Sequence, residues 1–277
     1  MTGAIKTLRE GDRRRVVEFL EQAPYENLFL LSRIDEWGID RRRLGRLLSF
    51  EKGGEIVGLC LDGGTVFVTG NDPDALPFFV LELGRWRRCS SILGPSFPAL
   101  GVFVGLAERW RQQWGSVSNV RRKQPVMLLD GPPRVEPDPR VKRITRDDFQ
   151  SYLDASVDMY AEEIGSSPFK YGPGYESFAL ARVDEGDAYG IVENGEVIFK
   201  ADLGPRHDGQ VQLQGVWLKP DLRGSGQSSA MLSGMLGLVR RRFPQVSLYV
   251  NDFNTPAIKS YERLGFRHVG MLSTVHY

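Results

Sequence analysis

The feature of this sequence that most constrains its fold is an internal repeat. The segments that begin at Ile5 (IKTLREGDRRRVVEFLEQA) and at Val141 (VKRITRDDFQSYLDASVDMY) share a short alternating strand, an acidic helix start and apolar residues at helical spacing. Later, residues 53–63 and 194–204 each combine a glycine-containing turn with an apolar strand. The paired segments keep their order and a similar spacing, which favours two related domains over a chance likeness within an α/β protein.

The chain has 277 residues, which is enough for two domains, each with its own core. The segment Asp130–Arg140 (DGPPRVEPDPR) is proline-rich and lacks periodicity, as expected of a linker. We therefore predict a first domain over residues 1–131, a linker over 132–139 and a second domain over 140–277.

In the second half, three apolar strands at hairpin spacing follow two helical segments: AYGIVEN, EVIFKADLG and GQVQLQGVWLKP. Apolar residues at helical spacing then run from Leu232 to Phe243, where Pro244 stops the pattern. A strand, a helix and a last strand complete the order β, α, α, β, β, β, α, β, α, β. This order predicts an α/β (α+β) fold with a mostly antiparallel, mixed, twisted sheet flanked by helices.

Composition limits the function classes. Lys and Arg number 36 against 35 Asp and Glu, so no overall charge recruits nucleic acid or a membrane surface. The two cysteines, Cys60 and Cys89, support neither a disulfide framework nor a zinc site. His207, His268 and His276 have neither metal-binding spacing nor a plausible nucleophile partner, so we expect chemistry without a metal. A charged amino terminus and the lack of a long apolar run predict a cytoplasmic protein. The oligomeric state does not follow from the sequence.

The stretch Arg223–Ser228 (RGSGQS) is the strongest candidate for a binding site. A helix that begins at a glycine turn directs unpaired N–H groups, and the positive end of its dipole, toward an anion. Gly224 and Gly226 allow a ligand to approach the backbone, and Arg223 adds a positive charge suited to phosphate. Neither a Walker loop nor a dinucleotide-binding fingerprint fits these letters. The alternative is an ordinary helix start capped by Ser225 or Ser228.

Two motifs of the second half resemble the GNAT superfamily of acyl-CoA-dependent N-acyltransferases. Arg223–Ser228 is similar to the family's acyl-CoA signature, although Ser228 stands where the family has glycine or alanine. Asn254–Phe266 (NTPAIKSYERLGF) is similar to the segment in which an asparagine, an alanine, a tyrosine and a Gly-Phe pair recur. The resemblance covers roughly residues 140–277. The first half matches only in layout, and prolines replace the glycine turn after its meander.

This resemblance implies two GNAT-like domains, of which the first is a degenerate copy unable to bind coenzyme A. The alternative is that the first half is an unrelated small α/β domain. For the second domain the resemblance implies acetyl-CoA as co-substrate and transfer of its acetyl group to an amine. The residues that it assigns to binding acetyl-CoA are Val216, Trp217, Leu218, Arg223, Gly224, Ser225, Gly226, Gln227, Ser228 and Asn254.

The resemblance also assigns catalytic roles. The N–H of Val216 would polarise the thioester carbonyl, and Tyr261 would act as general acid toward the departing thiolate. The apolar positions change parity around Gly215, which by itself suggests a bulge or splayed strand. An ordinary core strand, kinked at Gly215, fits the same letters. Tyr261 could also be a packing residue, and Asn254 an N-cap.

The proton acceptor and the acceptor amine are less constrained. Glu162 and Glu163 lie where family members contact the acceptor, although a solvated acidic helix end is the alternative; Asp252 is a weaker candidate. Phe169, Tyr171 and Tyr175 could line the acceptor pocket, or belong to a plain loop. The acceptor is expected to be a small-molecule amine or a protein amino terminus. Two other functions are compatible: a non-catalytic CoA-binding regulator, and a GNAT-fold transferase that uses aminoacyl-tRNA.

Overall fold

The computed structural model describes residues 3–171 and 174–277, and its contacts divide the chain into two compact units. The first unit comprises residues up to Val126 together with Tyr249–Asn254 and His268–Tyr277, and the second comprises Met127–Leu248 and Thr255–Arg267. The sequence-based division assigned all of 140–277 to one domain. It differs from the observed grouping because the last strand pairs within the first unit.

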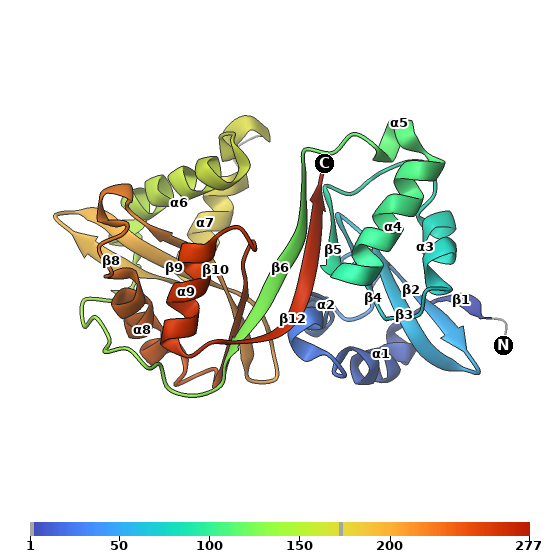
Figure 1. The fold of residues 1–277 in the computed structure, drawn as a ribbon, viewed down its shortest axis with the longest axis horizontal. Coiled ribbons are helices and arrows are strands. Elements are labelled where there is room, and N and C mark those ends of the chain that lie inside the picture. The colour runs from blue at the N-terminus through green and yellow to red at the C-terminus, as the bar shows by residue number, and fades with distance from the viewer. Residues whose placement is uncertain (1–2, 172–173) are drawn as a thin grey trace. The chain divides into compact units, whose positions relative to one another are not determined.

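The same order of elements occurs twice (Figure 1). The first series is β1 (Ala4–Thr7), α1 (Arg13–Leu20), α2 (Pro24–Trp37), β2 (Arg46–Lys52), β3 (Glu55–Asp62), β4 (Thr65–Thr69), α3 (Ala75–Leu83), β5 (Ser91–Pro95), α4 (Ser96–Arg109), the short α5 (Arg111–Trp114) and β6 (Asn119–Leu129). The second is β7 (Lys142–Arg143), α6 (Phe149–Ile164), α7 (Gly174–Asp184), β8 (Ala188–Glu193), β9 (Glu196–His207), β10 (Gln210–Leu218), α8 (Ser228–Val239), β11 (Gln245–Tyr249), α9 (Thr255–Leu264) and β12 (Arg267–His276). The order predicted for the second half is confirmed, and the first half repeats it apart from α5.

The two series also begin with the same local contacts. In the first, the Asp12 carboxylate accepts hydrogen bonds from the backbone N–H of Arg9 at 3.1 Å and from Lys6 Nζ at 3.1 Å. In the second, Asp148 accepts them from the N–H of Thr145 at 3.3 Å and from Lys142 Nζ at 3.2 Å. One aspartate thus stops the strand and starts the helix in both halves, which supports their common origin.

In the first unit the strands lie in the order β1-β2-β3-β4-β5-β12-β6. Neighbours from β1 to β4 are antiparallel, and β4 and β5 are parallel. Successive residues of one strand point to opposite faces. Accordingly Leu47 packs in the core that α1 and α2 cover, and Leu48 packs in the core that α3 and α4 cover. Figure 1 shows these two helix pairs on opposite faces of the sheet.

Strand β12 completes the sheet of the first unit. It pairs antiparallel with β5, from Leu272 opposite Pro95 to His276 opposite Ser91. On its other side, the Thr274 hydroxyl donates a hydrogen bond of 2.6 Å to Gln124 Oε1 of β6. The final strand of the second series therefore takes its place among strands of the first.

In the second unit the strands lie in the order β11-β10-β9-β8-β7, and only β10 and β11 are parallel among the neighbours. Tyr152 and Leu153 of α6 pack with residues of α7 and with Trp217 of β10 in one buried cluster. Helix α8 buries Leu232, Met235, Leu236 and Val239, as the apolar spacing predicts, but it ends at Val239. Phe243 is buried just beyond the helix.

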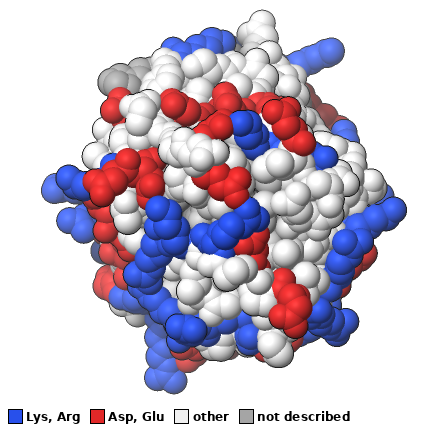
Figure 2. Space-filling model, turned by 90° about the vertical axis from the view of Figure 1, so that its left-hand side faces the viewer, with Lys and Arg blue, Asp and Glu red and all other residues white. Residues whose placement is uncertain are grey.

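The surface carries both signs of charge. On the face displayed in Figure 2, acidic and basic side chains are interspersed. Exposed ion pairs of the second unit include Arg146–Asp184 at 2.7 Å and Lys219–Glu196 at 2.6 Å. None of the helices in the described part of the chain is both long and apolar enough to cross a membrane.

Candidate functional site

Strands β10 and β11 of the second unit separate along their length. Their parallel pairing covers only Gln210–Gln212 against Gln245–Ser247, although β10 continues to Leu218. Beyond Gln212, the edge of β10 that faced β11 therefore has no strand partner among the residues that the structure describes. An unpaired strand edge presents backbone N–H and C=O groups that an extended ligand can bind.

The predicted irregularity around Gly215 is confirmed as a bulge. Gln214 pairs with Asp202 of β9, and the next paired residue is Trp217, which lies opposite Lys200. Gly215 has a φ of 56°, in the region that favours glycine. The bulge moves Val216 and Leu218 to one face as half-buried residues, whereas the Trp217 side chain lies in the core with 6% of its surface exposed. Trp217 can therefore contribute to a ligand site only through its backbone.

The turn before α8 is open and built on two left-handed glycines. Gly224 and Gly226 have φ values of 77° and 82°, and a Cβ added at either would meet no atom within 4 Å. The Ser225 hydroxyl donates to the carbonyl of Leu222 at 2.6 Å, and the N-cap of α8 is Gln227, which makes no side-chain cap. Neither Ser225 nor Ser228 therefore caps the helix, so no side-chain cap occupies the helix start, where an anion would bind.

Arg223 is held in place beside this turn. Its Nε donates to the carbonyl of Leu218 at 2.8 Å, and its Nη2 donates to both carboxylate oxygens of Glu162, at 3.0 and 2.8 Å. The pair is nearly half exposed on both sides, so solvent screens it. The structure thus brings Glu162 to the predicted phosphate-binding arginine, where an incoming phosphate would compete with it.

Tyr261 lies on α9 with 8% of its surface exposed, and its ring packs against Phe266 at 5.8 Å between centroids. Burial and, to a smaller extent, the negative charge of Glu163 together raise the pKa of Tyr261 to about 12. The phenol therefore keeps its proton at neutral pH. Glu163 is exposed at the end of α6, and its negative charge acts on the phenol of Tyr261.

A buried polar cluster, which sequence reasoning missed, packs against the bulge. Lys200 and Tyr152 are each 1% exposed, and both contact Asp202: Lys200 Nζ at 2.7 Å from Oδ2 and Tyr152 Oη at 2.9 Å from Oδ1. A Cβ added to Gly215 would lie 2.7 Å from Asp202 Oδ2. The one sequence signal was a pair of charges, two residues apart, within the apolar stretch VIFKADL. Because side chains two apart share a face, both charges enter the interior together.

The other predicted residues are placed less tightly. Asn254 and Asp252 are exposed in the segment before α9, which groups with the first unit. Phe169 and Tyr175 form an edge-to-face pair with centroids 6.2 Å apart, and Tyr175 donates to the carbonyl of Ser156 at 2.9 Å. The side chain of Tyr171 lies outside the described residues. Within the described chain, no group of three or more His, Cys, Asp or Glu side chains is arranged to hold a metal ion.

Comparison with known proteins decides the family. Residues 145–266 match the family model described as Acetyltransferase (GNAT) family, and this range includes the glycine turn, the bulge and Tyr261. The carboxy-terminal half belongs to the GNAT family. Residues 45–152 match a family described as a domain of unknown function, DUF4081.

A solved structure extends the likeness to the whole chain. It is a tandem GNAT protein from the clavulanic acid biosynthesis pathway, 14% identical, with a TM-score of 0.53 over 100% of this chain and 98% of that one. At this identity the likeness concerns the fold. The predicted fold class, two GNAT-like domains with mostly antiparallel mixed sheets flanked by helices, is confirmed.

Several relatives are named mycothiol acetyltransferase. The protein from Corynebacterium aurimucosum is 26% identical over 88% of this chain and 86% of its own length. The protein from Acidothermus cellulolyticus is 46% identical over 22% of this chain, and the match spans only 19% of that protein. Together with the GNAT match, these relatives support acyl-CoA-dependent acetyl transfer.

Proposed function

We propose that the second half of the chain transfers the acetyl group of acetyl-CoA to a primary amine. The observation that carries this proposal is the open glycine turn at the start of α8, which follows directly on the unpaired length of β10. The turn offers amides for a pyrophosphate, and the strand edge offers hydrogen-bonding groups for the pantetheine arm. An extended donor with an anionic end is the ligand that fits both.

Donor binding in this scheme uses the backbone of Val216, Trp217 and Leu218 along the strand, and that of residues 224–228 at the turn. The side chain of Arg223 would exchange its ion pair with Glu162 for the pyrophosphate. Since that ion pair is exposed and screened, the exchange costs little. Asn254 is proposed to bind a pantetheine amide.

In the chemical step the amine nitrogen attacks the thioester carbonyl carbon. A C–N bond forms, the C–S bond breaks, and the thiolate of coenzyme A leaves. The N–H of Val216 would stabilise the oxyanion, and the Tyr261 phenol would donate a hydrogen bond to the departing sulfur. A phenol whose pKa is about 12 holds its proton more tightly than a thiol does, so this bond stabilises the thiolate without complete proton transfer.

Glu163 is the proposed acceptor of the amine proton. Its carboxylate is exposed and lies near enough to Tyr261 to affect the phenol electrostatically. Both oxygens of Asp202, in contrast, already accept hydrogen bonds from Tyr152 and Lys200. We therefore propose that Asp202 is a positioning residue, which fixes the bulge so that the N–H of Val216 has a constant direction.

The proposed acceptor is a small-molecule amine, and amines related to mycothiol are the first to test because of the relatives named above. The assay follows thiol release from acetyl-CoA in the presence of an amine panel. Turnover that falls in Tyr261→Phe, with donor binding unchanged, would support catalysis by this site. Donor binding without turnover on any amine would instead indicate a CoA-binding regulator. Thermal stabilisation by aminoacyl-tRNA, with none by acetyl-CoA, would overturn the choice of donor.

A further inference from the structure

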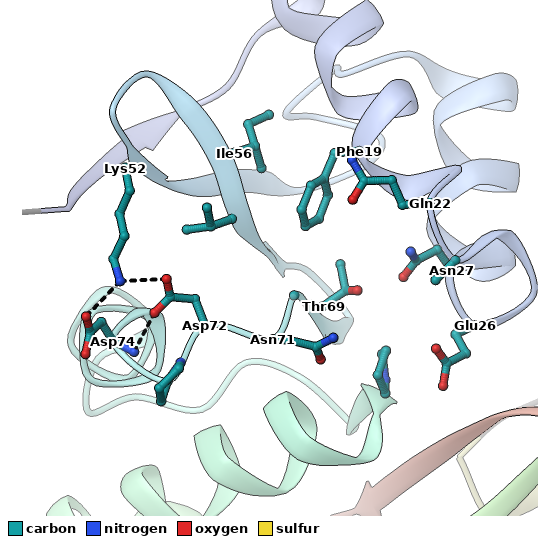
Figure 3. Close-up of a pocket in the computed structure, with 15 residues that line it drawn as sticks. Phe19, Gln22, Glu26, Asn27, Lys52, Ile56, Thr69, Asn71, Asp72 and Asp74 are labelled. Carbon is teal, nitrogen blue, oxygen red and sulfur yellow. Dashed lines mark hydrogen bonds and ion pairs between the residues drawn. The ribbon is translucent and has the colours of Figure 1, made fainter. Parts of the chain in front are cut away.

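The first unit contains a cavity of its own, with a volume of about 750 Å³ (Figure 3). Its walls are the end of α1, the start of α2 and the turn between them, parts of β2 and β3, the ends of β4 and β5, and the loop 70–74 that leads into α3. This volume falls in the range of small-molecule sites. In the repeat, the end of β4 and the start of α3 correspond to the end of β10 and the start of α8, where the second unit has its glycine turn.

The chemistry at this end of β4 disfavours an anion. Asp72 and Asp74 stand before α3, and both bind Lys52 Nζ, at 2.6 and 2.8 Å. The N–H groups that a phosphate would need are engaged as well: that of Ala75 by the carbonyl of Asp72, and that of Asp74 by Asp72 Oδ1. The lining carries three carboxylates, with Glu26 as the third, and one ammonium group, which gives an excess of two negative charges.

The opposite wall presents hydrogen-bond acceptors. Asn27 is 2% exposed, and its Nδ2 donates to the carbonyl of Leu20 at 2.9 Å, so its Oδ1 is left buried without a partner among the described residues. Glu26 accepts one bond, from the N–H of Met271 to Oε1 at 2.8 Å, and no ion pair with it occurs in the described chain. Figure 3 shows both side chains facing Thr69 and Asn71 across the cavity.

We infer that this cavity binds a small organic ammonium compound. A protonated amine has several N–H donors and one positive charge, which match the unpartnered Asn27 Oδ1, the Glu26 carboxylate and the excess of negative charge. Hydroxyl groups on the same compound would be matched by Thr69 and Asn71, and an apolar portion by Phe19. The site is built from the first unit alone and does not depend on the function proposed for the second half.

The test uses the full chain and matched pairs of probes: ethanolamine with ethylene glycol, serinol with glycerol, and cyclohexylamine with cyclohexanol. At least one amine is expected to raise the melting temperature and to give binding heat, whereas its hydroxyl counterpart does not. Glu26→Gln keeps the oxygen that Met271 contacts but removes the charge, and should weaken binding by about tenfold to a hundredfold. Thr69→Val, which preserves shape, should weaken hydroxylated amines by about two- to tenfold.

Glu55→Gln is the matched control, because Glu55 is an exposed carboxylate of the same unit outside the cavity lining. It should leave amine binding unchanged. The inference fails if no amine of the panel binds, if the uncharged partners bind equally well, or if Glu26→Gln and Glu55→Gln have the same effect. It also fails if pyrophosphate binds and Glu26→Gln does not alter amine binding. Acetyl transfer by the second half is measured separately and has no bearing on these outcomes.

Discussion

Three glycines of the second unit allow one substitution, glycine to alanine, to test the geometry of the site. Gly226 has a φ of 82° and open space around it, Gly215 has a φ of 56° and close neighbours, and Gly237 lies inside α8 with open space. The same methyl group therefore meets three different environments. The expected changes in the free energy of unfolding differ in size and in sign.

At Gly226 only the backbone conformation resists the change, so alanine should destabilise the fold by about 1–2 kcal/mol. At Gly215 the new Cβ would also lie 2.7 Å from Asp202 Oδ2 and 3.1 Å from Lys200 Nζ, which adds an overpacking cost of about 1–3 kcal/mol. At Gly237 alanine should stabilise the helix by up to about 1 kcal/mol, because alanine has the higher helix propensity.

Urea unfolding of the three variants measures these energies, and steady-state kinetics with acetyl-CoA measures their effect on the site. Gly226→Ala should raise the KM for acetyl-CoA, Gly215→Ala should lower kcat, and Gly237→Ala should change neither. Equal stability of Gly226→Ala and Gly237→Ala would show that residue 226 does not need the left-handed conformation. A normal KM in a destabilised Gly226→Ala would show that the turn does not bind the donor.

Three further predictions concern the charged and phenolic groups. Lys200→Met should lower the free energy of unfolding in urea by about 3–5 kcal/mol, because it leaves the Asp202 carboxylate unpaired in the interior. A loss below about 1 kcal/mol would contradict a buried ion pair between these residues. Arg223→Gln should raise the KM for acetyl-CoA but change the melting temperature by only a few degrees. Glu162→Gln should leave the KM and the melting temperature nearly unchanged. An equal rise in KM in the two variants would mean that the ion pair itself binds the donor. Burial raises the pKa of Tyr261 from 10.0 to about 12, so the folded state holds this proton more tightly than the unfolded chain does. The stabilising contribution of the protonated phenol is therefore complete below pH 10.0 and is lost as the pH rises toward about 12. Urea unfolding at about pH 9 and about pH 11 should show a loss in the wild type that exceeds the loss in Tyr261→Phe by about 1.3 kcal/mol; parallel losses would place the phenol in solvent.

Much of the fold could be predicted because the repeat is marked by short-range sequence patterns. The aspartate that follows each first strand by a few residues, the glycine turns and the helical spacing all act within about ten residues. The bulge was also foreseeable, because the apolar positions change parity at Gly215. The sequence analysis valued Gly224 and Gly226 because they allow a ligand to approach the backbone, and the structure adds that both have the left-handed conformation that favours glycine.

Other features depend on contacts between distant segments and could not be predicted. The sequence of β12 predicts a half-apolar strand but does not determine which strand it pairs with. Its pairing with β5 was therefore not predicted. Lys200 and Asp202 are charges of the kind usually found in solvent, and their burial depends on their own ion pair and on the hydroxyl of Tyr152, 50 positions from Asp202 in the chain. The ion pair between Glu162 and Arg223 joins residues 61 positions apart.

The position of β12 has a consequence for biosynthesis. Strand β5 receives its neighbour on one side only when residues 268–277 have left the ribosome, so the amino-terminal sheet cannot close while the rest of the chain is still being made. Until then the edge of β5 is open to pairing with other nascent chains. A fragment that stops at residue 131 would keep that open edge permanently and would be prone to aggregate, even though its own series of strands and helices is complete.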